Sequence, residues 1–481
     1  HPCAVSGISP YIKHYEGLSY DREDLHRKHL RARRASHPQE YTLQLDFTAF
    51  HRTFRLHLKR NAAAFSEDFM VFRKNVSTLA DLSHIYSGTL EGEHGSACYG
   101  SVLQGQFEGT IHTDNGTYHV EPVQRYTSSQ TDHHSIIYHE DDMGKTTFGF
   151  QPKKYSFHIY FITAPSEAPA SRWRRTVDES KTSCLLHLHA DHLYYKKFKS
   201  VEAVLAQVTS SVFKHPVNDI YDKVDFDGIK LINFKVKSLN VMTEEDKNDP
   251  LYPLYIGPEK LLSLYSENNW GNFCLSYLLT NRDYSGTLGL AWEGKADNWG
   301  GICSQQTTLR NGRRSTLNTG LVTVQNYGQF LPPRHVQLTL AHELGHSLGS
   351  PHDEGSNCGN LGSSGGKGRY LMFSHATDEV RENNDKFSPC TIEHISKLLK
   401  LKKDDCFVVS DQPICGNQIV EEDEECDVGH NDTDLCCFSA KQPVDVQCRL
   451  KPGKENLTVC SQGTRVCMSG VGDSTWFDCI A

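Results

Sequence analysis

Alternating apolar and polar residues near the start of the chain predict β-structure. Residues 41–47 (YTLQLDF) and 54–58 (FRLHL) show the period of two that is typical of half-buried strands. The glycine-rich stretch 99–109 is typical of turns between short strands. We therefore expect residues 1–175 to form a mainly β domain.

The middle of the chain interleaves two kinds of pattern. Short apolar runs predict strands at residues 183–193, 230–241, 273–281 and 321–325. Apolar stripes at helical spacing and helix-starting prolines predict helices at residues 201–224, 258–264, 333–348 and 391–403. Strands that alternate with helices are typical of a sheet with helices around it, so we expect an α/β domain at residues 176–408.

The helix predicted at residues 333–348 has a well-defined core face. Its apolar residues recur every four positions, at Val336, Leu340, Leu344 and Leu348. His342 and His346 lie off this stripe, and because they are four residues apart they share a face of the helix. The two imidazoles can therefore point at one ion.

The residues after this helix complete a pattern for metal binding. Gly349 can adopt a positive φ, so the chain can turn back and bring His352 towards His342 and His346. Three neutral imidazoles leave one position of a tetrahedral zinc ion open to water, as in catalytic sites. Glu343, next to the first ligand, can reach that water. The alternative, an exposed helix that carries histidines by chance, does not account for the glycine and the third histidine.

Composition and charge narrow the classes of function. The chain has 50 basic and 59 acidic residues, and its net charge of −9 argues against nucleic acid as the main partner. No apolar run reaches the roughly 18 residues that a membrane-spanning helix needs, so we expect no membrane span in this sequence. The chain begins with His1 and has no apolar signal segment, so we expect a processed or trimmed form.

The cysteines are concentrated at the end of the chain. Of the 16 cysteines, two lie in residues 1–183, six in 184–410 and eight in the last 71 residues. This density predicts a small disulfide-rich segment at residues 409–481. Acceptor triplets for N-linked glycans, Asn-x-Ser/Thr, occur at Asn75, Asn115, Asn431 and Asn456. Together these features predict a protein of the secretory pathway, at the cell surface or extracellular.

Two basic runs, 31–34 (RARR) and 172–175 (RWRR), each have two interpretations. Either run is a solvated charge cluster or a patch for a polyanion, or it is a cleavage site for a proprotein convertase. The second run follows a linker of small residues, 164–171, of the kind that proteases cut easily. We therefore predict cleavage after Arg175, whereas both interpretations stay open at Arg34.

Several motifs together resemble one known family. They are the AHELGHSLGSPHD run at 341–353, the later methionine in YLMF at 370–373, the cysteine-rich tail, and the stretches YIKHYEGLSY at 11–20, YHEDD at 138–142, LGLAW at 288–292, LNTGLVTVQNY at 317–327 and QPICGN at 412–417. With these motifs the chain resembles the disintegrin-and-metalloproteinase (ADAM) family, and within it the Kuzbanian-type branch. The likeness extends over nearly the whole chain.

The resemblance implies a fold and a domain order. It implies a mainly β prodomain at residues 1–175, an α/β metzincin protease domain with a twisted mixed sheet and helices at 176–408, and a truncated disintegrin-like segment at 409–481. Substrate would add as a strand along the edge strand at 288–292. Met372 would form a turn beneath the metal. The disulfides that the resemblance implies are Cys184–Cys274, Cys303–Cys406 and Cys358–Cys390.

A second metal site is expected in the tail, with an alternative. Oxygen-bearing side chains at short spacing suit Ca²⁺, and related disintegrin domains bind calcium at matching positions. The residues concerned are Asn417, Glu421, Glu424 and Asp427. The alternative is an ordinary acidic surface run.

Three departures from the family pattern stand out. The branch usually carries a zinc-capping cysteine after its YHEDD motif, but residues 143–170 contain none, and nothing in the sequence places Cys98 near the metal. Val428 stands where a further cysteine is expected. The stalk, membrane helix and cytoplasmic tail that are usual in the family do not follow before Ala481.

The expected function is therefore that of a zinc-dependent metalloendopeptidase made as a zymogen. His342, His346 and His352 would bind zinc, and Glu343 would accept the proton of the attacking water. The family suggests membrane-protein ectodomains as substrates, Notch-like receptors among them, and a convertase as the activating partner. The alternative is a non-proteolytic adhesion or receptor-binding module that acts through the disintegrin segment.

Overall fold

A computed structural model of the chain describes 16 segments of the sequence. They are residues 8–34, 41–74, 76–143, 177–212, 217–296, 299–309, 312–354, 358, 367–374, 381–410, 420, 424–428, 431–434, 436–439, 442 and 446–451. We call residues 1–175 the N-terminal region and residues 176–408 the central region. The boundary between these two regions stays a prediction.

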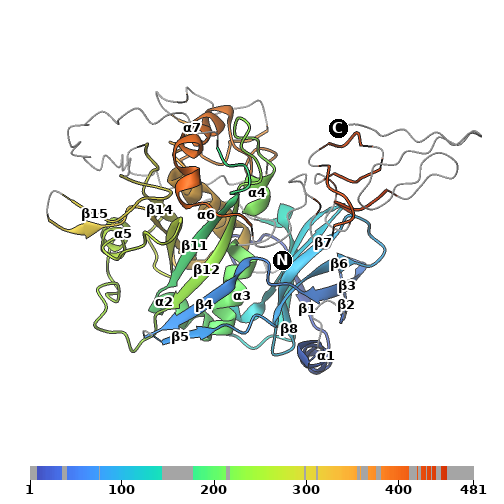
Figure 1. The fold of residues 1–481 in the computed structure, drawn as a ribbon. Coiled ribbons are helices and arrows are strands. Elements are labelled where there is room, and N and C mark those ends of the chain that lie inside the picture. Colours follow the sequence, from blue (N-terminus) through green and yellow to red (C-terminus); the bar gives the residue numbers. More distant parts are fainter. Residues whose placement is uncertain are drawn as a thin grey trace, which may run out of the picture.

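The N-terminal region contains an eight-stranded antiparallel sheet, which appears in blue and cyan in Figure 1. In sheet order its strands are β1 (Glu16–Leu18), β10 (Ser135–His139), β9 (Gly116–Pro122), β8 (Gln106–Thr113), β7 (Ala97–Leu103), β6 (Ile85–Leu90), β3 (Arg52–Arg60) and β2 (Leu43–Ala49). Residues alternate between buried and exposed along all of β2, as the sequence pattern predicts. Helix α1 (Arg22–Arg34) contacts this sheet and buries Leu25, His29 and Ala32. Two 3₁₀ turns, η1 (Val123–Arg125) and η2 (Glu140–Asp142), flank β10.

The prediction that residues 99–109 contain a turn between short strands is confirmed. These residues form the paired strands β7 and β8, and the turn between them is confined to Gln104 and Gly105, whose φ angles are 50° and 73°. Gly100 and Gly109 face each other across the pair. A Cβ atom at Gly100 would lie 2.2 Å from the Glu108 carbonyl oxygen, so this glycine permits close approach of two strands.

The central region is built on a seven-stranded mixed sheet. In sheet order its strands are β14 (Gly289–Ala291), β17 (Thr319–Thr323), β13 (Leu275–Thr280), β11 (Ser183–Ala190), β12 (Asn233–Val241), β4 (Phe65–Arg73) and β5 (Val76–Leu79). Neighbouring strands are parallel, except that β14 and β5 run antiparallel at the two edges. β4 and β5 come from the N-terminal region, so the sheet crosses the predicted boundary. The described residues also form two small hairpins outside the two sheets. They are β15 (Thr307–Thr308) with β16 (Arg314–Ser315), and β18 (Gln325–Asn326) with β19 (Gln329–Phe330).

Helices surround this sheet, as the α/β prediction requires. They are α2 (His192–Phe198), α3 (Val201–Val212), α4 (Asn218–Asp222), α5 (Pro258–Tyr265), α6 (Pro333–Ser347) and α7 (Pro389–Cys406). The prediction of one helix over residues 201–224 was wrong, since α3 ends at Val212 and α4 begins at Asn218. Pro216 lies between them in the sequence, and proline both lacks an amide hydrogen and disfavours helical geometry in the residue before it.

The central core is contiguous from the sheet to the helix α6. The stripe predicted on that helix is confirmed, since Val336, Leu340, Leu344 and Leu348 are all buried in this core. Disulfide bonds join Cys184 to Cys274, Cys303 to Cys406 and Cys358 to Cys390, the pairs that the family resemblance implies. Within the described residues, no helix has the length and apolar character needed to cross a membrane.

Candidate metal centre

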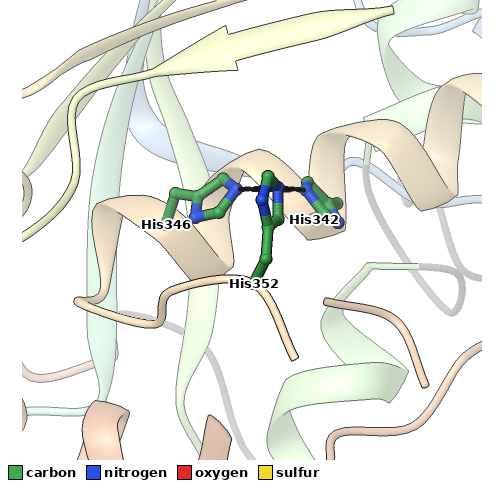
Figure 2. A group of neighbouring side chains, drawn as sticks. All are labelled: His342, His346 and His352. Carbon is green, nitrogen blue, oxygen red and sulfur yellow. Dashed lines mark hydrogen bonds between the residues drawn. The ribbon is translucent and has the colours of Figure 1, made fainter. Parts of the chain in front are cut away.

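Helix α6 and the turn after it bring the three histidines together. The helix begins with Pro333 at its first position, where a missing amide hydrogen costs nothing. It ends before Gly349, whose φ of 94° turns the chain back. The amide of Ser350 then donates to the carbonyl of Gly345, at 3.0 Å, which closes the helix end. His352 therefore returns to the face that carries the helical histidines, as Figure 2 shows.

The three imidazole rings converge on one point. The Nε2 atom of His346 lies 3.1 Å from that of His342 and 3.1 Å from that of His352, and the remaining pair is 3.3 Å apart. Nitrogen ligands at the usual zinc distance in tetrahedral geometry are about 3.3 Å from each other. Three imidazole nitrogens cannot all donate and accept within one such triangle, whereas a cation at its centre satisfies all three lone pairs. These residues therefore fit a zinc ion.

Backbone carbonyls fix the orientation of the two helical imidazoles. Nδ1 of His342 lies 2.8 Å from the Leu371 carbonyl oxygen, and Nδ1 of His346 lies 2.8 Å from the Ser350 carbonyl oxygen. Only a protonated Nδ1 can donate to a carbonyl, so each Nε2 keeps its lone pair for a metal. No role was predicted for Leu371 or Ser350. Every residue type has a backbone carbonyl group, so such an acceptor cannot be recognised from the sequence.

Burial keeps these imidazoles neutral. Burial is the main cause that lowers the pKa of His342 to about 4, and the adjacent His352 adds to it. The pKa of His346 is lowered well below its usual value by burial and then by the other two histidines. Both rings are half-buried, whereas His352 is exposed. The site is therefore open on the side of His352, where a ligand or substrate can enter.

Glu343 lies against the edge strand of the sheet. Its side chain is only 6% exposed, and burial raises the pKa of its carboxyl group to about 8. A Cβ atom added at Gly289, on β14, would lie 2.6 Å from Oε1 and 2.6 Å from Cγ of Glu343. Because Gly289 has no side chain, the side chain of Glu343 can occupy the space beside it. The prediction that residues 288–292 form an edge strand is confirmed, but the sequence did not reveal this role for Gly289.

Met372 packs beneath the metal-binding helix. Its side chain is fully buried, and a Cβ atom at Gly345 would lie 2.4 Å from its Sδ atom. Gly345 therefore allows the sulfur atom to approach the helix between the two histidines. The amide of Asp353 donates to the Met372 carbonyl oxygen at 2.9 Å, which ties the segment after His352 to the methionine turn. The site is thus supported from below by a segment about 20 residues further along the chain.

Two buried tyrosines hold α6 in place, and sequence reasoning missed both. Tyr221 donates from its hydroxyl to the Ala341 carbonyl oxygen at 2.7 Å, and the Tyr277 hydroxyl lies 2.8 Å from Oγ of Ser347. Tyr277 lies in an apolar stretch that is typical of ordinary core, and Tyr221 lies among charged residues, so neither tyrosine indicates its partner in the sequence. Their hydroxyl groups hold α6 next to each of its two histidines, at Ala341 before His342 and at Ser347 after His346.

The structure describes only part of the predicted calcium site and does not describe the predicted cleavage site. Glu424 and Asp427 lie close together with Cys448, which is disulfide-bonded, while Asn417 and Glu421 lie outside the described residues, so the calcium site stays a prediction. Arg175 also lies outside them.

Cys98 belongs to the core of the N-terminal sheet and not to the core that includes α6. It lies on β7, is fully buried in the core of the N-terminal sheet, and burial raises the pKa of its thiol. A buried thiol of this kind is a poor metal ligand, since metals bind the thiolate.

Comparisons with known proteins indicate the family of the chain. A family model described as metallo-peptidase family M12B, reprolysin-like, matches residues 202–401, and one described as reprolysin family propeptide matches residues 8–99. The "disintegrin and metalloproteinase domain-containing protein 10" of Bos taurus is 42% identical over 93% of this chain and 64% of its own length. That of Homo sapiens is 43% identical over 91% of this chain and 62% of its own length.

More distant proteins also match. A Caenorhabditis elegans homologue of the same protein is 30% identical over 96% of this chain and 59% of its own length. The solved metalloproteinase-II from Bacteroides fragilis aligns with 75% of this chain and 92% of its own, at 12% identity and a TM-score of 0.37. The chain spans about 64% of the length of the Bos taurus relative. The chain belongs to the ADAM family of reprolysin-like metallopeptidases, in its Kuzbanian-type branch.

Proposed function

We propose that this chain is a zinc-dependent endopeptidase of the sheddase type. The observation that carries the proposal is the convergence of three Nε2 atoms, 3.1 to 3.3 Å apart, beside a buried glutamate that touches the edge strand of the sheet. A structural zinc site would use four protein ligands, whereas three ligands leave a position for chemistry.

The three histidines and Glu343 have different roles in the proposed peptide hydrolysis. His342, His346 and His352 would hold the zinc ion, which when bound supplies Lewis acidity to a water molecule and to the scissile carbonyl. Glu343 accepts a proton from the attacking water at a carboxylate oxygen and returns it to the leaving amine. A glutamate whose pKa is raised to about 8 by burial binds a proton more tightly than a free one, and a nearby cation favours the ionised form that starts the reaction.

The edge strand β14 presents the substrate. β14 is the terminal strand of the sheet, so an extended peptide can pair with its outer edge. Because Gly289 on this strand lies against Glu343, a peptide bound there passes directly in front of the glutamate. This arrangement favours an endopeptidase that binds extended polypeptide.

The finer parts of the proposal rest on the family. The substrates are ectodomains of membrane proteins, Notch-like receptors among them, and the protein acts extracellularly or at the cell surface. The chain is made as a zymogen whose N-terminal region, matched over residues 8–99 by a propeptide family model, is separated after Arg175 by a proprotein convertase. Calcium binding by Asn417, Glu421, Glu424 and Asp427 belongs to the same set of proposals.

The test pairs peptide cleavage with metal analysis. A quenched fluorescent peptide is incubated with the convertase-treated protein and with the variants Glu343→Gln and His346→Ala. We expect Glu343→Gln to retain zinc but to lose at least about a hundredfold in kcat/KM, because removal of a general base typically costs two to four orders of magnitude. His346→Ala should lose both zinc and activity.

Two results would contradict the proposed function. Full cleavage by Glu343→Gln would refute the assigned base. An inert wild-type protein that contains zinc and binds receptors would favour the adhesion module instead.

A further inference from the structure

The N-terminal region supplies a strand to the sheet of the central region. β4 pairs in parallel with β12, at the end of the sheet opposite to β14, and β5 pairs with β4 on the outside. The amide of Val236 on β12 donates to the Ala64 carbonyl oxygen at 3.0 Å. In Figure 1 the blue strands β4 and β5 lie beside the green β12. A hairpin from one side of the predicted cleavage site thus completes a sheet on the other side.

The side chains of β4 fill the core of the central region. Phe65, Phe69 and Val71 are 3%, 3% and 2% exposed, and they belong to the cluster formed by the central sheet and helix α6. The rings of Phe65 and Phe69 lie 4.5 Å apart. On the outer strand β5, by contrast, Val76 and Leu79 are 61% and 78% exposed. The inner strand is therefore held by buried apolar side chains as well as by its backbone.

Two ion pairs flank the added strand. Lys237 on β12 donates to Asp68 at 2.8 Å and holds the pKa of that carboxyl group below its usual range. Lys74, at the end of β4, pairs with Glu245. Exposed pairs of this kind contribute little stability, so the buried side chains of β4 carry the attachment and set the register of the two strands.

A second contact between the two regions involves no strand pairing. Arg125, held by Glu108 and Glu121 of the N-terminal sheet, lies 5.4 Å from the ring of Phe198 and 5.7 Å from that of Phe330. This contact orients the N-terminal sheet against the central region. It differs from the β4 contact because no strand is shared, so the two contacts can be separated by mutation.

We propose that the edge of β12 is a docking site for one β-strand, and that residues 64–79 occupy it and hold the N-terminal region in place after the chain between the two regions is cut. Backbone pairing supplies affinity, and the pockets for Phe65, Phe69 and Val71 supply selectivity. Departure of the hairpin exposes a second free sheet edge in the protease, besides β14, for strand pairing.

The test uses the full chain with a site-specific protease sequence introduced between residues 164 and 171. After cleavage, size-exclusion chromatography measures whether the two fragments separate. We expect the wild-type fragments to elute together. The variant Phe69→Ala/Val71→Ala should release the N-terminal fragment at least about a hundredfold faster, because two side chains are lost from a closed core. The matched control, Val76→Ala/Leu79→Ala, removes the same number of apolar side chains from the exposed strand and should behave as wild type.

A second measurement on the wild-type protein keeps the proposal testable if the double variant does not fold. Hydrogen exchange of residues 235–240 should be slow in the cut but associated form and fast once the N-terminal fragment has been displaced, because the Val236 amide loses its partner. Immediate separation of wild-type fragments would overturn the proposal. So would co-elution of the Phe69→Ala/Val71→Ala fragments at the wild-type rate, or unchanged exchange at 235–240 after release.

Discussion

Replacing Gly289 by alanine places a methyl group in the space that Glu343 now occupies. The added Cβ atom would lie 2.6 Å from both Cγ and Oε1 of the glutamate. Carbon atoms in contact prefer about 3.5 Å, so the glutamate or the edge strand must shift by about 1 Å. The backbone itself tolerates alanine there, because Gly289 is not among the residues with positive φ. The substitution therefore acts on the position of the carboxylate and on little else.

The expected effect is large for so small a change. A displacement of about 1 Å in a reacting group costs on the order of a hundredfold in rate, which equals about 2.7 kcal/mol of transition-state stabilisation. Zinc content should be unchanged, because the three histidines are not contacted. The melting temperature should change little, because the three atoms nearest to the added Cβ atom all belong to the flexible side chain of Glu343, which can rotate away.

The assay is kcat/KM for a quenched peptide, measured together with zinc content and thermal unfolding. Gly257→Ala serves as the control, since a Cβ atom there would meet only Oε2 of Glu259, at 3.3 Å. The control should retain wild-type activity. Wild-type kcat/KM in Gly289→Ala would refute the placement of the glutamate against β14, and loss of zinc in that variant would refute the claim that only the carboxylate is displaced.

Two further predictions concern the stability of the central region. Leu344→Ala, on the buried stripe of α6, should lower the free energy of unfolding by about 3 kcal/mol in urea titration, and a cost under about 1 kcal/mol would contradict the assigned core face. Burial lowers the pKa of His187 to about 3, with a smaller effect from His189, so the unfolded chain binds a proton below about pH 6.5 that the folded chain rejects. The stability that His187 contributes is therefore complete above about pH 6.5 and falls as the pH drops from there towards 3, by about 1.4 kcal/mol per pH unit. The variant His187→Gln should lose less stability between about pH 7.5 and 5.5 than wild type, and an equal loss would count against a neutral buried histidine.

The metal site could be predicted because its information is local. Two histidines four residues apart must share a helix face, and Gly349 allows the turn that returns His352. The core stripe on α6 followed from the same periodicity. Geometry over a dozen residues therefore determines most of the ligand set, and distant parts of the chain only have to support it.

The supports of the site could not be predicted in this way. Gly289 and Tyr277 act through contacts with residues far along the chain, and an isolated glycine or tyrosine in an apolar stretch carries no signal of its partner. The strand β4 illustrates the same limit. No strand was predicted at residues 65–73, and the period of apolar residues does not say which sheet a strand joins.

The central claim is tested most directly by zinc X-ray absorption spectroscopy on the purified protein. We expect three imidazole nitrogen ligands at about 2.0 Å plus one oxygen ligand that does not come from the protein, and a loss of one imidazole in His352→Ala. A spectrum with four protein ligands, with a sulfur ligand after removal of the N-terminal region, or with no change in His352→Ala would contradict it.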